Sequence, residues 1–319
     1  MERRMITVLA GGTGAAKFLQ GLQAVLGAET SRLTVIVNTG DDLLWWGLHV
    51  SPDVDSVMYG LAGVLSRERG WGIDGDTFHC LDAMRRLGGP AWFSLGDRDL
   101  ATHMTRTALL ASGSTLAEAT AELARRFRVT ARILPMSNDR VETRVTTPAG
   151  ELAFQEYFVR ERHQVPARGV RFAGAESAHP APGVLQAIAH ASAVIIAPSN
   201  PVTSIGPILA VPGIREALRQ TPATVAAISP IIGGAAVSGP AVDLMRSQAL
   251  PASAVGIAQA YADFLDRLVA DTRDTSLMPD IERLGLRPHF CETLMTSLEA
   301  KALLAAETLR AAGVELVET

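Results

Sequence analysis

The sequence predicts an α/β protein with a doubly wound, Rossmann-like sheet that is mainly parallel and covered by helices on both faces. Short runs rich in β-branched residues alternate with helix-length amphipathic segments, which is the pattern of βαβ units. The loops after these runs are polar or rich in glycine, as expected where parallel strands end at a ligand site. With 319 residues, 48% of them hydrophobic and 19% charged, the chain can bury one large core. We expect a single domain over residues 1–319.

Five buried strands and eight helices are predicted along the chain. The strands are apolar on both faces, which favours parallel pairing, and they span residues 5–10, 33–38, 193–197, 224–229 and 268–271. The helices span residues 17–25, 53–65, 77–87, 116–126, 182–190, 214–220, 253–264 and 298–311. The right-handedness of βαβ crossovers then leaves few topologies.

Two segments depart from this alternation and are predicted to be insertions into the same domain. Residues from about 71 to 128 are expected to form a helical insert. Residues from about 130 to 174 alternate apolar and polar side chains in the runs 132–134, 141–147 and 152–158. Turn residues at 148–150 separate two of these runs, so the segment is predicted to be an antiparallel hairpin.

Composition excludes several classes of function. The chain has 29 basic and 33 acidic residues, a net charge of −4, so a dedicated nucleic-acid-binding protein is disfavoured. Two cysteines exclude a disulfide framework and a cysteine-rich zinc module, which favours a reducing cytoplasm. The start resembles a secretory signal, but its apolar run is short and ends at glycines, so a first strand explains it better. No stretch has the length of a membrane span, and no membrane association is expected.

A glycine-rich loop follows the first predicted strand. It contains Gly11, Gly12, Thr13 and Gly14, and Lys17 stands one turn further on. Glycines allow backbone N–H groups to surround an anion at a helix N-terminus, and the lysine can reach a phosphate. The loop lacks the third glycine of a dinucleotide fingerprint and the Gly-Lys-Ser/Thr of a Walker loop. A phosphate or nucleotide contact is therefore predicted, with a plain strand-to-helix turn as the alternative.

An acidic cluster follows the second predicted strand. Asp41 and Asp42 end that strand, and Asp53 and Asp55 follow Pro52 at the start of a predicted helix. Mg²⁺ bound to phosphates needs only one or two carboxylates from the protein, so Asp41, Asp42 and Asp53 are predicted metal ligands. Asp55, Asp42 or Asp53 is predicted to orient or deprotonate a hydroxyl group. Capping of the helix N-terminus is the alternative for this cluster.

Other strand ends carry further candidates for the same cleft. Phosphate or donor contacts are predicted at Asn38, Ser199, Asn200, Ser229, Gly233 and Gly234. A tight structural turn explains the glycine pair equally well. Arg98 lies in a charged segment and is predicted to clamp a phosphate, unless that segment is a solvated loop of ion pairs. Trp46 follows the acidic pair and is predicted to stack on a planar ring, although tryptophan is more often a core residue.

These segments together resemble the 2-phospho-L-lactate transferase family of coenzyme F420 biosynthesis. The matching stretches run in the family's order over nearly the whole chain, at residues 10–17, 37–42, 51–55, 95–103, 133–137, 197–207, 229–234 and 238–240. The combination is far more specific than any single stretch. By residue chemistry alone the sequence indicates a phosphate-containing ligand, a divalent cation and a group transfer.

The resemblance implies a Mg²⁺-dependent transferase with two small-molecule substrates. In this family the terminal ribityl hydroxyl of a deazaflavin, 7,8-didemethyl-8-hydroxy-5-deazariboflavin (Fo), attacks a guanosine-diphosphate-activated hydroxy acid, and GMP leaves. The product is F420-0 or its dehydro form, and phospholactate, phosphoenolpyruvate and 3-phosphoglycerate donors are all plausible. The resemblance places Fo contacts at Asp55 and Ser94 and implies a homodimer.

Two other functions remain possible from the sequence. A related family of nucleotide-sugar-binding regulatory proteins shares the core and the glycine loop, but residues 51–55 and 95–103 favour the transferase. A nicotinamide-dependent dehydrogenase is disfavoured because the third glycine is missing and because carboxylates follow the second strand so closely.

Overall fold

Seven parallel strands form the central sheet of the computed structural model, which describes residues 5–237 and 239–315. Every neighbouring pair in this sheet runs in the same direction. In spatial order the strands are β14 (Arg287–Cys291), β13 (Arg267–Asp271), β10 (Thr224–Ile228), β9 (Ala193–Ile196), β1 (Ile6–Ala10), β2 (Leu33–Val37) and β5 (Arg132–Pro135). β1 therefore lies at the point where the chain turns from one half of the sheet to the other, the switch point at which such sheets bind ligands.

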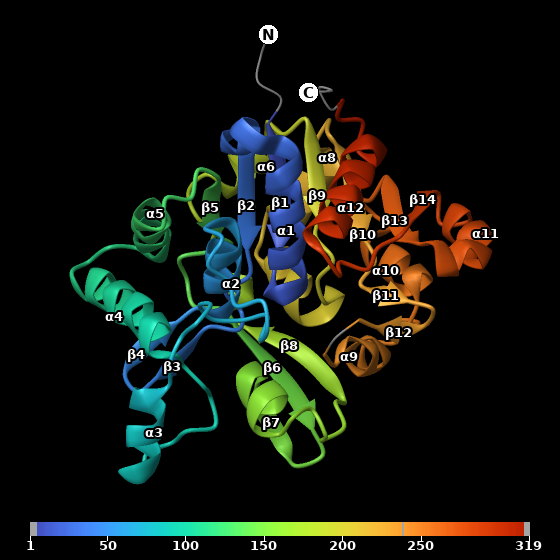
Figure 1. The fold of residues 1–319 in the computed structure, drawn as a ribbon. Coiled ribbons are helices and arrows are strands. Elements are labelled where there is room, and N and C mark those ends of the chain that lie inside the picture. Colours follow the sequence, from blue (N-terminus) through green and yellow to red (C-terminus); the bar gives the residue numbers. More distant parts are fainter. Residues whose placement is uncertain (1–4, 238, 316–319) are drawn as a thin grey trace.

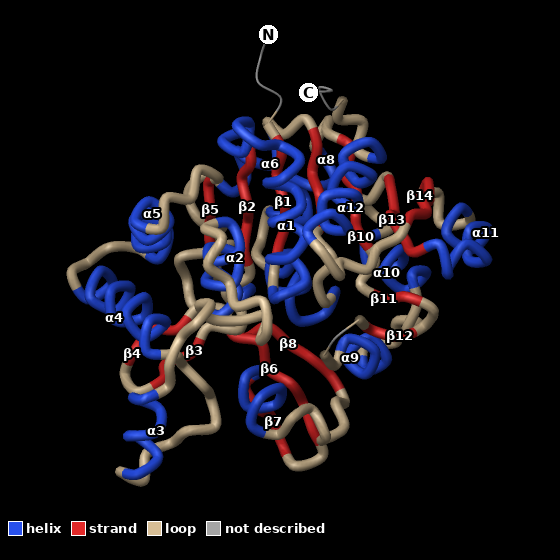
Figure 2. Tube along the Cα trace, viewed as in Figure 1, coloured by secondary structure: helices blue, strands red, loops and turns tan. Residues whose placement is uncertain are grey.

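Helices cover both faces of this sheet (Figures 1 and 2). One face packs against α1 (Gly12–Leu26), α2 (Pro52–Leu61), α5 (Leu116–Arg126) and α12 (Leu298–Ala311). The other packs against α6 (Val184–Ala189), α7 (Gly206–Ala210), α8 (Ile214–Gln220), α9 (Ala241–Ser247), α10 (Ala254–Tyr261) and α11 (Met278–Glu282). Successive residues of β1 point to opposite faces, so Val8 belongs to the first apolar cluster and Leu9 to the second. The predicted doubly wound fold is confirmed.

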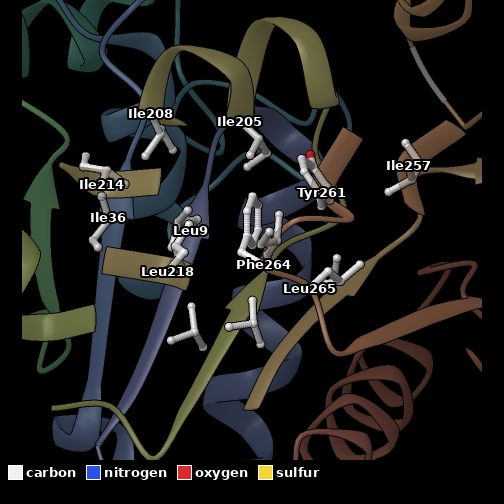
Figure 3. Packing of buried hydrophobic residues seen from close by; sticks show 14 of the residues in the cluster. Leu9, Ile36, Ile205, Ile208, Ile214, Leu218, Ile257, Tyr261, Phe264 and Leu265 are labelled. Carbon is white, nitrogen blue, oxygen red and sulfur yellow. The ribbon is translucent and has the colours of Figure 1, made fainter. Parts of the chain in front are cut away.

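The second cluster is built mainly from aliphatic side chains (Figure 3). Leu9 and Ile36 reach it from the sheet, and Ile208 from α7, while Tyr261 closes it from α10. These side chains are almost completely buried. Burial of this much apolar surface on both faces explains why the strands read as continuous hydrophobic runs.

Smaller elements lie at the carboxyl edge of the sheet, the lower edge in Figure 1. They comprise the hairpin of β3 (Leu43–Trp45) and β4 (Leu48–Val50), the helices α3 (His79–Arg86) and α4 (Asp97–Ala111), the three strands β7 (Gly150–Ala153), β6 (Glu142–Thr147) and β8 (Gly169–Ala173), and the hairpin of β11 (Ile231–Ile232) and β12 (Ala235–Ala236). Short 3₁₀ or π turns occur at Gly27–Arg32, Glu156–Arg160, Ala175–Ser177, Pro201–Ile205 and Thr272–Leu277.

The predicted helices and strands are all present, with three differences in the insertions. Residues 132–134 were assigned to the hairpin, but they belong to β5, which pairs with β2 in parallel because its apolar side chains are buried in the main sheet. Residues 154–158 were expected to extend a strand, but they belong to a short helical segment over 154–160 that brings aromatic side chains together. The charged segment from Asp97 onwards was considered as a loop, but it is the first turn of the 15-residue helix α4.

β14 was not predicted, because the residues from Arg287 to Cys291 are only partly buried and lack a β-branched side chain. It closes one edge of the sheet beside β13. Within the described residues, none of the helices has the length and apolar character needed to cross a membrane.

The contact between α1 and α12 offers a direct test of this packing. A methyl group on Gly21 of α1 would lie 2.1 Å from the carbonyl oxygen of Lys301 in α12, and backbone cannot give way as a side chain can. We expect Gly21→Ala to lower the free energy of unfolding by about 1–3 kcal/mol, as overpacking does in other cores. Urea denaturation followed by circular dichroism measures this change.

Gly169→Ala is the matched control, because a methyl group there meets no atom within 4 Å. Equal stability of the two variants would contradict the close packing of α1 on α12.

Candidate functional site

The carboxyl ends of the parallel strands open into a cavity of about 570 Å³. The strand-end loops form one wall, and α2, α4 and the turn after β7 form the other. Twelve residues predicted from the sequence line it, namely Gly11, Gly12, Thr13, Gly14, Lys17, Asp41, Asp53, Asp55, Ser94, Ser199, Asn200 and Ser229. Six predicted residues lie outside its lining, namely Asn38, Asp42, Trp46, Arg98, Gly233 and Gly234.

The glycine loop joins β1 to α1 at the base of the cavity. Gly12 is the first residue of α1, and its φ of 73° is a conformation that favours glycine. A Cβ atom on Gly14 would lie 2.3 Å from the carbonyl oxygen of Pro198, so the loop after β9 packs directly on the glycine loop. The Ser199 hydroxyl donates to the carbonyl oxygen of Gly11 at 2.8 Å. Gly11 has no side chain to cap α1, and the Gly12 N–H is engaged by the Asp53 carboxylate, so the N–H groups of Thr13 and Gly14 are the ones that can meet an anion in the cavity.

Two buried carboxylates, Asp41 and Asp53, lie beside this loop, and a Cβ atom on Gly11 would be 2.8 Å from Asp53 Oδ2. Burial, and next the charge of Asp53, raises the pKa of Asp41 well above its usual range. Burial raises the pKa of Asp53 to about 6, although the Asn38 amide donates to this carboxylate at 2.9 Å. Asp41 Oδ1 is buried and has no hydrogen-bond partner among the described residues. The pair is therefore an incompletely neutralised negative site next to an anion-binding loop.

Asp42 has a different environment from Asp41. Its Oδ2 accepts a hydrogen bond from the Ser51 hydroxyl at 2.7 Å and lies 3.0 Å from His49 Nε2. Burial raises the pKa of Asp42, and these two partners oppose that rise. Asp42 thus ties the β3–β4 hairpin to the start of α2. Ser51 precedes α2 but makes no capping hydrogen bond, because its hydroxyl is used by Asp42.

A buried polar network, the α2–α4 network, joins two helices along one wall of the cavity. It consists of Asp55 and Tyr59 from α2 and of Asp99, His103 and Arg106 from α4. Arg106 Nη1 donates to Asp55 Oδ2 at 3.1 Å, and Nη2 donates to Asp55 Oδ1. The Tyr59 hydroxyl donates to Asp99 Oδ1 at 2.7 Å. All five side chains are buried, and all except Arg106 line the cavity.

The charges of this network are set by burial and by the partners together. Burial alone would raise the pKa of Asp99, but the contact with His103, and then the Tyr59 hydroxyl, hold it below its usual range. Burial raises the pKa of Tyr59 well above its usual range, and the charges of Asp55 and Asp99 raise it further. Tyr59 is therefore a hydrogen-bond donor at neutral pH.

The sequence prediction gave the arginine role to Arg98, but Arg106 is the arginine that meets a site carboxylate. Arg98 is exposed, and its Nη1 donates to the carbonyl oxygen of Asp74 at 3.3 Å. The spacing of Asp99, His103 and Arg106 places the three on one face of a helix and was the available sequence signal. The segment was placed in the predicted helical insert, but Arg106 was given no role because its partner Asp55 is 51 residues away in the sequence.

Two aspartates cap each other's helices and fix α4 in position. The Asp76 carboxylate accepts from the backbone N–H groups of Arg98 and Asp99, at 2.8 and 3.0 Å, at the start of α4. Asp97, the first residue of α4, accepts from the N–H groups of His79 and Cys80 at the start of α3. Each carboxylate thus satisfies donors that a helix N-terminus leaves unpaired.

Other predicted residues have local partners. Gly233 and Gly234 form the turn between β11 and β12, with φ values of 55° and 78°, and the Gly233 N–H donates to the Asp274 carboxylate at 3.1 Å. Trp46 Nε1 donates to the carbonyl oxygen of Pro90 at 2.9 Å, and its ring stacks on Trp45. Ser238, part of the stretch 238–240 used for the family resemblance, lies outside the described residues.

Comparison with known proteins identifies the family. A family model described as 2-phospho-L-lactate transferase CofD matches residues 6–303. The chain belongs to this family. It is therefore a transferase, and its family acts in coenzyme F420 biosynthesis. Membership decides in favour of the transferase over the regulatory and dehydrogenase alternatives.

Relatives with two different names match the chain equally well. A phosphoenolpyruvate transferase of Kitasatospora aureofaciens is 46% identical over 310 residues, covering 95% of this chain and 96% of the relative. A 2-phospho-L-lactate transferase of Methanosarcina mazei is 43% identical over 298 residues, covering 93% and 97%. A UPF0052 family protein of Bacillus halodurans matches in structure with a TM-score of 0.64 at 17% identity, covering 96% of this chain and 99% of that one. This last similarity shows a common fold.

The buried carboxylates also predict an unusual response of stability to mutation. A charged group without a full set of partners costs about 1–3 kcal/mol or more when buried. Because the pKa of Asp41 is raised in the folded state, its favourable contribution exists only at low pH and is lost as the pH rises through that pKa. We expect Asp41→Asn to raise the melting temperature of the metal-free protein by roughly 2–6 °C at pH 8.

Differential scanning calorimetry at pH 8 measures this shift. Asp82→Asn, which changes an exposed carboxylate on α3, is the control and should have little effect. A lower melting temperature for Asp41→Asn would show that the Asp41 charge is already compensated.

Proposed function

We propose that the protein transfers a phosphorylated hydroxy-acid group from a guanosine-diphosphate-activated donor to the ribityl hydroxyl of Fo and releases GMP. One observation carries the proposal: the glycine loop, Lys17 and the Asp41–Asp53 pair meet in the same cavity as Asp55 and Ser94. The glycine loop, Lys17 and the two aspartates suit a diphosphate. Asp55 and Ser94 are the positions at which the family resemblance places Fo. Action in the cytoplasm as a homodimer stays a prediction.

The donor diphosphate is expected at the glycine loop. The N–H groups of α1 that follow Gly12 attract negative charge, and Lys17 adds a positive charge from the next turn. Ser199 and Ser229 line the neighbouring strand ends. Phosphoryl transfer depends mainly on alignment and on neutralisation of charge, so these groups have the required properties.

Mg²⁺ fits the residues present. The described residues contain no group of three or more His, Cys, Asp and Glu side chains suited to a metal ion. Mg²⁺ that binds phosphates needs only one or two protein carboxylates, however, and Asp41 and Asp53 offer two. The unpartnered Oδ1 of Asp41 is the observation that favours a cation there. When bound, Mg²⁺ supplies positive charge against the diphosphate and the leaving phosphate.

The acceptor Fo is expected against the opposite wall. Asp55 and Ser94 line that wall, and so do the aromatic rings of Trp71, Phe93 and Phe158, which suit a planar ring system. The ribityl hydroxyl oxygen forms a bond to the phosphorus distal to guanosine as the bond from that phosphorus to the GMP oxygen breaks. The hydroxyl proton leaves to a carboxylate of the cavity, for which Asp55 and Asp53 are the candidates.

A product assay tests the proposed function. Purified protein is incubated with Fo, Mg²⁺ and, in parallel, the GDP-activated phospholactate, phosphoenolpyruvate and 3-phosphoglycerate donors, and products are followed by mass spectrometry. We expect one donor to give an Fo adduct and GMP in equal amounts, and to give no adduct when EDTA replaces Mg²⁺. Absence of product with all three donors would reject the proposal.

Lys17 provides a sharper test of the donor end. Loss of a hydrogen bond to a charged group costs about 1.5–3 kcal/mol, so we expect Lys17→Ala to raise the KM for the donor roughly 10- to 100-fold. The KM for Fo should change little. Lys301, the only other lysine of the chain, binds Gln20 outside the cavity, and Lys301→Ala is the control. An unchanged KM for the donor in Lys17→Ala would reject the phosphate role of Lys17.

A further inference from the structure

The α2–α4 network is more elaborate than a contact between two helices requires. Five polar side chains are removed from water at one helix pair, and the guanidinium of Arg106 is completely buried. Replacing buried ionic groups by well-packed apolar side chains is often neutral or stabilising. Stability of the α2–α4 contact therefore does not explain the network, whereas a requirement to fix one of its members does.

Donors and acceptors can be assigned along the network. Arg106 Nη1 lies 3.1 Å from Asp55 Oδ2 and 3.3 Å from His103 Nδ1. An arginine only donates, so His103 Nδ1 acts as an acceptor in this contact and the ring proton is on Nε2. His103 Nε2 lies 3.3 Å from Asp99 Oδ1, a close contact without hydrogen-bond geometry, and Asp99 Oδ1 accepts a hydrogen bond from the Tyr59 hydroxyl. The chain of contacts thus runs from Asp99 through His103 and Arg106 to Asp55.

Asp55 is the member of this chain whose carboxylate both lines the cavity and receives the arginine. Arg106 holds the Asp55 carboxylate end-on, with Nη1 and Nη2 each donating to one oxygen, so rotation of the carboxylate is restricted. The lone pairs that Arg106 does not use are the ones available to a ligand. A carboxylate fixed in this way selects a ligand that presents N–H or O–H donors at one defined position.

We infer that His103 and Asp99 are positioning residues that act through Arg106 to orient Asp55 toward the acceptor substrate, a planar heterocycle with hydrogen-bond donors on its edge. This inference rests on the proposed function, because Fo is the acceptor named there. It assigns to residues 99, 103 and 106 a role in acceptor binding and none in binding the guanosine diphosphate.

Equilibrium binding of two probes tests the inference without turnover. Calorimetry measures the Kd of Fo and, separately, the Kd of GDP with Mg²⁺. We expect His103→Leu to raise the Kd of Fo at least about tenfold, since Arg106 loses an acceptor and Asp55 its fixed orientation. The Kd of GDP should stay within about twofold. His103→Asn, which retains an amide oxygen near the position of Nδ1, should recover much of the affinity for Fo.

A double-mutant cycle separates positioning from a general structural effect. In an Asp55→Asn background, His103→Leu should cause little further loss of Fo affinity, because the group on which His103 acts has been altered. His289→Gln is the matched control. His289 of β14 lies away from the cavity, with its Nε2 2.8 Å from Glu307 Oε2 of α12, and this variant should bind Fo as the wild type does. If His103→Leu does not fold, Asp99→Asn takes its place in the same cycle, with an expected loss of Fo affinity of at least about threefold.

The outcomes distinguish the inference from the proposed function. If the wild-type protein does not bind Fo, both the proposed function and the inference are rejected. If the wild type binds Fo but the folded His103→Leu and Asp99→Asn variants bind it equally well, the inference alone is overturned. Equal losses of Fo affinity in the wild-type and Asp55→Asn backgrounds, or parallel losses of GDP affinity, also overturn it.

Discussion

The parallel register of β1 between β2 and β9 is the constraint on which the site depends. Ala10 pairs with Val37 on one side, and Leu9 pairs with Ile196 on the other, so the three strands end at nearly the same height. The chain segments that follow them are therefore held side by side whatever their sequence. Their close approach then demands glycine at Gly11 and Gly14, because a side chain at either position would overlap Asp53, Ser204 or the backbone of Pro198. The pairing of β1 with β2 and β9 thus restricts which residue types can occupy the glycine loop of the site.

The site combines groups that a protein core normally avoids. Asp41 and Asp53 are buried close to one another, and the carboxylates of Asp55 and Asp99 are buried a short distance away. The two acidic pairs differ in the groups that compensate their charge. Asp55 and Asp99 contact Arg106, His103 and the Tyr59 hydroxyl, whereas among the described residues Asp41 and Asp53 have no ion-pair partner and only hydroxyl, amide and backbone groups oppose their charge. The charges of Asp55 and Asp99 are therefore balanced before a ligand binds. The charges of Asp41 and Asp53 are stabilised most when a cation binds with the ligand.

The fold class and most helices and strands were predictable because hydrophobic period and strand-end glycines are local features of the sequence. The errors occurred where local pattern does not decide the partner. The run 132–134 alternates like a hairpin strand, but β2 offers it a buried edge, and only tertiary structure reveals that choice. The site was predicted best where chemistry follows a strand directly, as at Gly11 to Lys17, Asp41 and Ser199. Arg106 was passed over because its partner Asp55 is 51 residues away, and spacing within one helix does not show such a contact.

The reciprocal caps at Asp76 and Asp97 have a consequence for how the family can vary. Gly96 lies so close to Asp76 that a side chain there would collide with the capping carboxylate, so residues 76, 96 and 97 can change only together. The stretch between the two caps is free of that restriction, since α3 and the loop after it contribute no residue to the cavity lining before Phe93. Changes in α3 and in the residues up to Gly89 leave the cavity lining and the positions of Asp99, His103 and Arg106 intact. The paired caps thus separate a surface segment that can vary from the helix that carries the buried network.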